Sequence, residues 1–133
     1  MKTTNELLHK IRKMKQSDIG LFTDKDFSPP KIHFYLSDLL REHGISSIDF
    51  FNKMGLERSY GYQILNGRRR PSRKLLIKTA ILLRLNLDET QRLLKIGNRE
   101  VLYPRVRADA IATFIIEKGL SLSEYQELTD KYR

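Results

Sequence analysis

Met54–Ser72 reads MGLERSYGYQILNGRRRPS, and this stretch predicts a short helix from about Glu57 to Asn66 that ends at Gly67. On a helical wheel the predicted helix has two unlike sides. One side is apolar and is expected to pack on a core. The other side carries groups that can hydrogen-bond base edges or phosphate oxygens: Arg58, Ser59, Tyr62, Gln63 and Asn66.

Three arginines follow this helix directly, at Arg68, Arg69 and Arg70. The chain of 133 residues has a net charge of +9, and the excess is concentrated around these arginines. Between residues 51 and 80 there are eight basic residues and one acid, Glu57. Such a concentration attracts a polyanion and gives salt-sensitive binding through counterion release. An ordinary solvated surface is the alternative interpretation of the charge alone.

Helical spacing continues on both sides of the opening stretch, and no strand pattern competes with it. Upstream, one helix is expected to end at Gly44, and the next begins at Ser46, which forms a capping pair with Asp49. Downstream, two more helices are expected to start near Pro71 and after Asn86. Residues 31–98 therefore predict an all-α domain of five helices.

The two ends of the chain are expected to be appendages to this domain. Residues 1–30 predict an arm or linker with a short helix, Thr4–Lys15. Residues 104–133 predict a C-terminal helical pair whose second helix starts with a capping box at Ser121. We expect the pair either to supply a dimer contact or to complete the core. Its first helix, Val106–Lys118, should carry apolar residues on one side: Ala110, Ile111, Phe114 and Ile115.

Composition argues against several classes of protein. Cysteine is absent, which removes disulfides, thiol nucleophiles and thiolate metal sites. His9, His33 and His43 lack ligand spacing, and no catalytic or phosphate-loop motif is present. We therefore expect neither an enzyme nor a metal or organic cofactor. The apolar runs are far shorter than the ~20 residues of a membrane span, and the N-terminus lacks a signal peptide's apolar core, so a cytoplasmic location without a membrane partner is expected.

Leu36 to about Gly97 resembles the helix-turn-helix domain of the phage repressor and Cro class, often called the XRE family. The segments that carry the resemblance are LLREHGISS, MGLERSYGYQILNGRRRPS and LDETQRLLKIG, and they span about half the chain. The resemblance implies a lambda-repressor-like five-helix fold and a sequence-specific regulator of transcription, with repression as the expected mode. The recognition helix, about Glu57–Asn66, would then lie in the major groove of double-stranded DNA.

The resemblance also implies roles for nine residues. Arginine bonds guanine O6 and N7 as a fork and glutamine pairs with adenine, so Arg58 and Gln63 are expected to set specificity. Tyr62 has an alternative role as a surface tyrosine that bridges to the preceding helix. Ser47 is short, so a backbone amide at that helix N-terminus is the alternative phosphate donor. Base reading is implied for Arg58, Ser59, Tyr62 and Gln63, and phosphate contact for Ser47, Asn66, Arg68, Arg69 and Arg70.

Two features depart from the family. Gly61 stands at a core-facing position where an aliphatic residue is usual, so Tyr60 or a residue of the preceding helix must fill the space. Leu40 and Leu65 stand where the family often has an arginine and a glutamate, and we expect them to touch.

One recognition helix reads only a few base pairs, so a homodimer on two half-sites is expected. The alternative function is a protein-interaction adaptor or antitoxin-like module with mainly nonspecific nucleic-acid binding, whose C-terminal helices hold a protein partner. RNA is less favoured, because only Tyr62 among the polar-side residues offers an aromatic ring for stacking.

Overall fold

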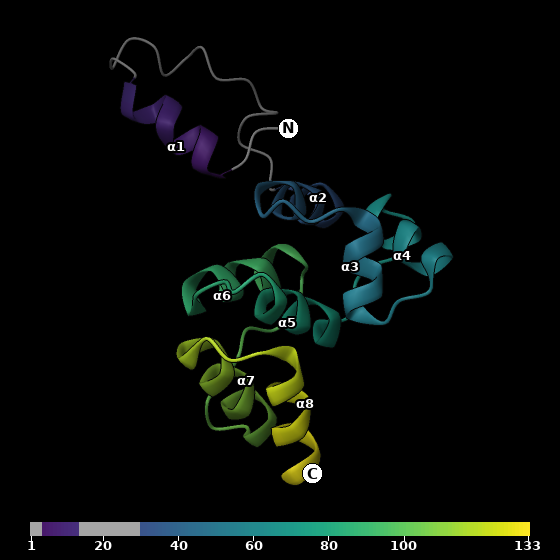
Figure 1. The fold of residues 1–133 in the computed structure, drawn as a ribbon. Coiled ribbons are helices and arrows are strands. Elements are labelled where there is room, and N and C mark those ends of the chain that lie inside the picture. The colour runs from purple at the N-terminus through teal and green to yellow at the C-terminus, as the bar shows by residue number, and fades with distance from the viewer. Residues whose placement is uncertain (1–3, 14–29) are drawn as a thin grey trace.

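The computed structural model describes residues 4–13 and 30–133, and within these ranges every regular element is a helix (Figure 1). The predicted all-α class is therefore confirmed for the described residues. The predicted end of the first helix, Lys15, lies outside them. The eight helices of the described ranges are α1 Thr4–Lys13, α2 Ile32–Glu42, α3 Ser47–Met54, α4 Arg58–Leu65, α5 Arg73–Leu82, α6 Leu87–Ile96, α7 Arg107–Lys118 and α8 Leu122–Lys131.

Side-chain caps define where several of these helices begin. The Ser46 hydroxyl accepts the backbone N–H of Asp49 at 3.1 Å, which confirms the predicted cap of α3. Asn86 and Glu89 form a complete capping box at the start of α6. At α8 the Ser121 hydroxyl accepts the backbone N–H of Glu124 and also bonds its carboxylate, so the cap was predicted correctly although its second bond differs.

The C-terminal pair of helices, α7 and α8, shares one core with the helices of residues 31–98. α7 packs against α5 and α6, and α8 packs against α5. Figure 1 shows α5 and α6 between the α3–α4 pair on one side and the α7–α8 pair on the other. One cluster of buried side chains joins the two parts, with Phe50, Ile64, Leu76 and Leu93 from the body and Ala112, Ile115, Ile116 and Tyr125 from the pair.

Only part of the predicted apolar side of α7 enters this core. Ile115 is fully buried, whereas Phe114 is 48% exposed and Ile111 is half-buried. The apolar residues predicted on one side of this helix are therefore divided between the core, which Ile115 enters, and the surface, where Phe114 stays exposed. The reason is that α7 meets α5 and α6 through residues spaced for one helical face, Asp109, Ala112 and Ile116, which leaves an apolar strip on the outer side.

Three arginines tie the connections around the C-terminal pair to the body. Arg73, in the first turn of α5, bonds both carboxylate oxygens of Asp109 on α7 at 2.8 and 2.9 Å. The Arg99 guanidinium donates to the backbone carbonyl of Pro71, and Arg84 donates to that of Gly119 at 2.5 Å. The pair is thus held by directional bonds as well as by apolar packing.

Candidate nucleic-acid interface

The turn between α3 and α4 depends on Gly55. This residue ends α3 with a φ of 66°, in the left-handed region where a side chain is strained. The next residue, Leu56, returns its N–H to the carbonyl of Phe51 at 2.8 Å, which closes the turn. α4 is one residue shorter at each end than predicted, because Glu57 and Asn66 are its flanking caps.

The inner side of α4 is fitted to α3 by a close approach. Gly61 is buried, and a Cβ atom placed on it would overlap the ring of Phe51. Of the two predicted ways to fill the space at Gly61, the one that uses the preceding helix is therefore correct. Leu40 is buried and Leu65 packs against the core where α2 meets α4, although their direct contact stays a prediction.

The outer side of α4 presents the predicted base-reading side chains together. Arg58 and Ser59 are exposed in its first turn, and Gln63 is half-buried one turn later. Tyr62 is 44% exposed, and its ring meets that of Phe51 edge-on with centroids 5.0 Å apart. Tyr62 is therefore anchored on α3, as its alternative role requires, while part of its ring stays open to solvent.

Gln63 and Arg69 are in direct contact, although nothing in their sequence spacing predicted it. Arg69 Nε donates to Gln63 Oε1 at 2.5 Å, and the Arg69 backbone N–H donates to the Gln63 carbonyl at 3.1 Å. The Arg69 guanidinium also lies 5.7 Å from the centroid of the Tyr60 ring, within the range of a cation–π contact. A residue assigned to phosphate contact thus touches one assigned to base reading.

The other phosphate candidates lie in different surroundings. Asn66 caps α4, and its Oδ1 accepts the backbone N–H of Arg68, so the exposed Arg68 side chain is carried on an ordered turn. The Arg70 guanidinium donates to the carbonyls of Gly97 and Asn98 at 3.5 and 3.3 Å. Arg70 therefore supports the C-terminal end of α6, where backbone carbonyls lack helical partners, and is separated from its two neighbours.

Ser47 occupies the first turn of α3, where backbone N–H groups lack carbonyl partners within the helix, although that of Asp49 is already bonded to the Ser46 hydroxyl. Its side chain is half-buried, and the cap itself is the preceding residue, Ser46. The backbone amides therefore remain the alternative to the Ser47 hydroxyl as a phosphate donor.

The basic side chains of the chain differ in whether a nearby carboxylate balances their charge. Arg73 belongs to the predicted basic segment, but its charge is balanced by the carboxylate of Asp109. Hydrogen bonding from Arg73 and from the Tyr103 amide lowers the pKa of Asp109 against the opposing effect of burial, so the carboxylate is ionised at neutral pH. The segment 104–133 carries five basic and five acidic residues and is neutral overall. The excess positive charge therefore remains with the α4 region.

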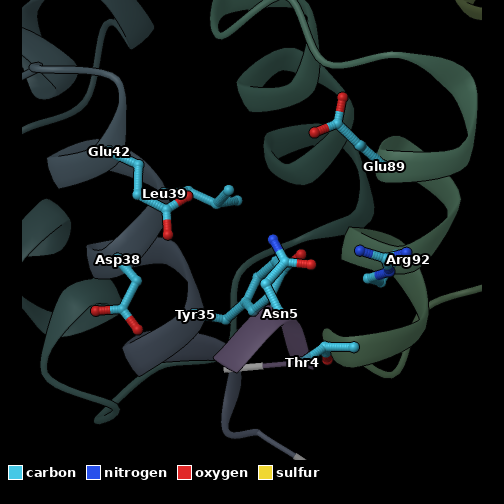
Figure 2. Close-up of a pocket in the computed structure, with 8 residues that line it drawn as sticks. All are labelled: Thr4, Asn5, Tyr35, Asp38, Leu39, Glu42, Glu89 and Arg92. Atoms are coloured by element: carbon cyan, nitrogen blue, oxygen red, sulfur yellow. The ribbon is translucent and has the colours of Figure 1, made fainter. Parts of the chain in front are cut away.

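A small polar cavity lies between α2 and α6, beside the start of α1 (Figure 2). Tyr35 is one of the residues that line it, and burial raises the pKa of this phenol while the neighbouring Arg92 opposes the shift. The cavity measures about 50 Å³, which suits ordered water and excludes an organic ligand. Among the residues that the structure describes, no cluster of three or more His, Asp or Glu residues suited to a metal ion is present.

A larger groove of about 580 Å³ lies on the outer side of α7 and α8. Its wall includes Ile111 and Phe114, which form the apolar strip left outside the core, together with Tyr132, which is 46% exposed. Exposed aromatic side chains in an apolar groove are typical of surfaces that bind a protein.

No protein family, curated protein or solved structure matches this chain. In the described ranges no helix has the length and apolar character needed to cross a membrane. The helical class is established by the structure, whereas the arrangement typical of lambda repressor and the XRE family remains a resemblance.

Proposed function

We propose that this protein is a sequence-specific, double-stranded DNA-binding regulator of transcription, with repression as its mode of action. The observation that carries the proposal is the outer side of α4, which exposes Arg58 and Tyr62 and joins Gln63 to Arg69 in the turn after the helix. The inner side of the same helix is fixed on α3 through Gly61 and Phe51. The proposed reading surface is therefore both polar and rigidly supported.

The size and charge of this surface suit the major groove. An α-helix fits the groove, and the eight residues of α4 span about 12 Å, enough for a few base pairs. Arg58 has the fork of donors that guanine O6 and N7 accept. The exposed Arg68 side chain follows the end of α4 and can neutralise a phosphate of the adjacent backbone. We assign no catalytic step to the protein.

We further propose that two copies bind DNA as a homodimer, joined through the groove on α7 and α8. The groove is lined by residues of α7 and α8. These two helices lie on the other side of α5 and α6 from α4, so a dimer formed through them leaves both reading helices open (Figure 1). The neutral charge of residues 104–133 lets two copies approach without the repulsion that two basic α4 surfaces would cause. In a two-fold dimer, Phe114 of each copy can fill space beside Ile111 of the other.

Selection of bound duplexes from a random DNA pool at near-physiological salt tests the proposed function. Enrichment of a two-fold symmetric site with half-sites about 10 base pairs apart is the expected result. Binding without enrichment, lost steeply as salt rises, would mean that the arginines supply charge attraction alone. Equal affinity for single-stranded RNA and duplex DNA would also contradict the proposal.

The second candidate is an adaptor or antitoxin-like module with mainly nonspecific nucleic-acid binding. The groove on α7 and α8 favours it, because an apolar groove can hold a helix of another protein as well as a second copy. If the protein is monomeric and binds random duplexes as well as selected ones, the result would favour this second function over the first.

A further inference from the structure

The contact between Arg69 and Gln63 determines which end of the glutamine amide is free. Three interactions hold Arg69 beside α4: its side-chain bond to Gln63 Oε1, its backbone bond to the Gln63 carbonyl, and its position over the Tyr60 ring. A single exposed bond would leave the guanidinium mobile, whereas three contacts restrict it to one place next to the Gln63 side chain.

The chemistry of the two side chains fixes the orientation of the amide. A guanidinium has only donors, so the Gln63 atom at 2.5 Å from Arg69 Nε must be the acceptor, Oε1. The Nε2 group, with its two hydrogens, is then the free end of the amide. Pairing with adenine needs both ends, because Oε1 must accept from N6 while Nε2 donates to N7. Guanine needs only donors, because O6 and N7 both accept.

We propose that Arg69 is a positioning residue that makes Gln63 a donor, so that Gln63 selects guanine rather than adenine. The inference rests on the proposed function, and it replaces adenine, the base expected for Gln63 from the sequence alone, with guanine. The positive charge of Arg69 supports this selection. If adenine were bound, its N6 amino group would donate to the same Gln63 Oε1 and would be repelled by the adjacent guanidinium. The Nη hydrogens of Arg69 can still bond a phosphate of the DNA backbone, so one side chain would both contact the phosphate and orient the base-reading Gln63.

Duplex selection with the full chain and three variants tests the inference. Gln63→Ala identifies the position of the site that Gln63 reads, since enrichment should disappear there and persist elsewhere. Arg69→Met removes the guanidinium and should shift the preference at that position from guanine to adenine. Arg68→Met is the matched control, because it loses the same charge while Arg68 bonds Asn66 through its backbone only.

The expected result for the wild-type protein is at least about a fivefold preference for guanine over adenine at the position that Gln63 reads. Arg69→Met should reverse the preference, and Arg68→Met should weaken all duplexes without changing it. A wild-type preference for adenine would overturn the inference, and so would a guanine preference that survives Arg69→Met. If the wild type enriches no base at any position, the proposed function itself fails, which is a separate outcome.

Discussion

Arg73 and Asp109 form an ion pair with two hydrogen bonds, at 2.8 and 2.9 Å, that joins α5 to α7. The Asp109 side chain is only 6% exposed, and it also accepts the backbone N–H of Tyr103. Removing one charge of a largely buried ion pair leaves the other charge without a counter-charge. We expect Asp109→Asn to lower the free energy of unfolding by about 2 to 3 kcal/mol, measured by urea denaturation. The exposed pair Arg133–Asp130 is the control, and Asp130→Asn should change stability by less than about 1 kcal/mol.

The same ion pair predicts a dependence of stability on pH. Because hydrogen bonding from Arg73 lowers the pKa of folded Asp109, its stabilising effect is fully present above the carboxyl pKa of the unfolded chain, about 4. The effect is lost as pH falls from there through the lowered pKa of the folded state. The difference in unfolding free energy between the wild type and Asp109→Asn should therefore shrink below about pH 4. A difference that stays constant with pH would show that the carboxylate charge is unimportant.

The close approach of Gly61 to Phe51 predicts a position intolerant of any side chain. Gly61→Ala should reduce stability by about 1 to 3 kcal/mol, because the ring of a buried phenylalanine has little room to move. Adding Phe51→Leu should restore part of the loss, so the two changes should be non-additive in urea denaturation. Ser59→Ala, on the exposed side of the same helix, should change stability by less than about 0.5 kcal/mol.

Arg58 and Arg68 should separate base reading from phosphate contact. Arg58→Ala should weaken binding to the selected site by about 1 to 3 kcal/mol and leave binding to unrelated duplexes nearly unchanged. Arg68→Ala should weaken all duplexes alike and reduce the slope of log affinity against log salt by about 1. Titrations of both variants over a salt series give these quantities. Identical behaviour of the two variants would contradict the division of roles.

The exposed ring of Phe114 should be needed for the proposed dimer. Phe114→Asp places a charge in the groove on α7 and α8, and we expect a monomer by analytical ultracentrifugation with the helical circular dichroism unchanged. Affinity for a two-half-site duplex should fall by about tenfold or more. Phe34→Asp is the control, since Phe34 is 51% exposed on α2 and should leave the dimer intact. A wild-type protein that is monomeric on and off DNA would rule out this interface.

Local features of the fold were predictable because their signals are local. The glycine at the end of α3 and the serine caps of α3 and α8 act through bonds to nearby residues, so spacing alone identified them. The two sides of α4 followed from helical periodicity in the same way. The exposed base-reading candidates Arg58 and Ser59 therefore lie together, as expected.

Features that depend on packing were not predictable from spacing. Arg73 and Asp109 are 36 residues apart, and nothing in either neighbourhood marks them as partners. The contact of Arg69 with Gln63 depends on how the chain turns after α4, and the bond of Arg70 to the end of α6 depends on where α6 packs. Which apolar residues of α7 enter the core was not predictable, because several neighbouring positions are apolar and periodicity does not show which of them face α5 and α6.

The arginine bonds around the C-terminal pair have a consequence for the spacing of a DNA site. A dimerisation segment on a flexible tether adapts to half-sites at several separations. Here Arg73, Arg84 and Arg99 hold α7, α8 and their connections to the body that carries α4. In the proposed dimer the two recognition helices would therefore stand at a fixed separation and angle. One inserted base pair turns a half-site by about 35° about the DNA axis, and such a rigid dimer cannot follow this rotation. The protein would therefore select the spacing between the two half-sites as well as their base sequence.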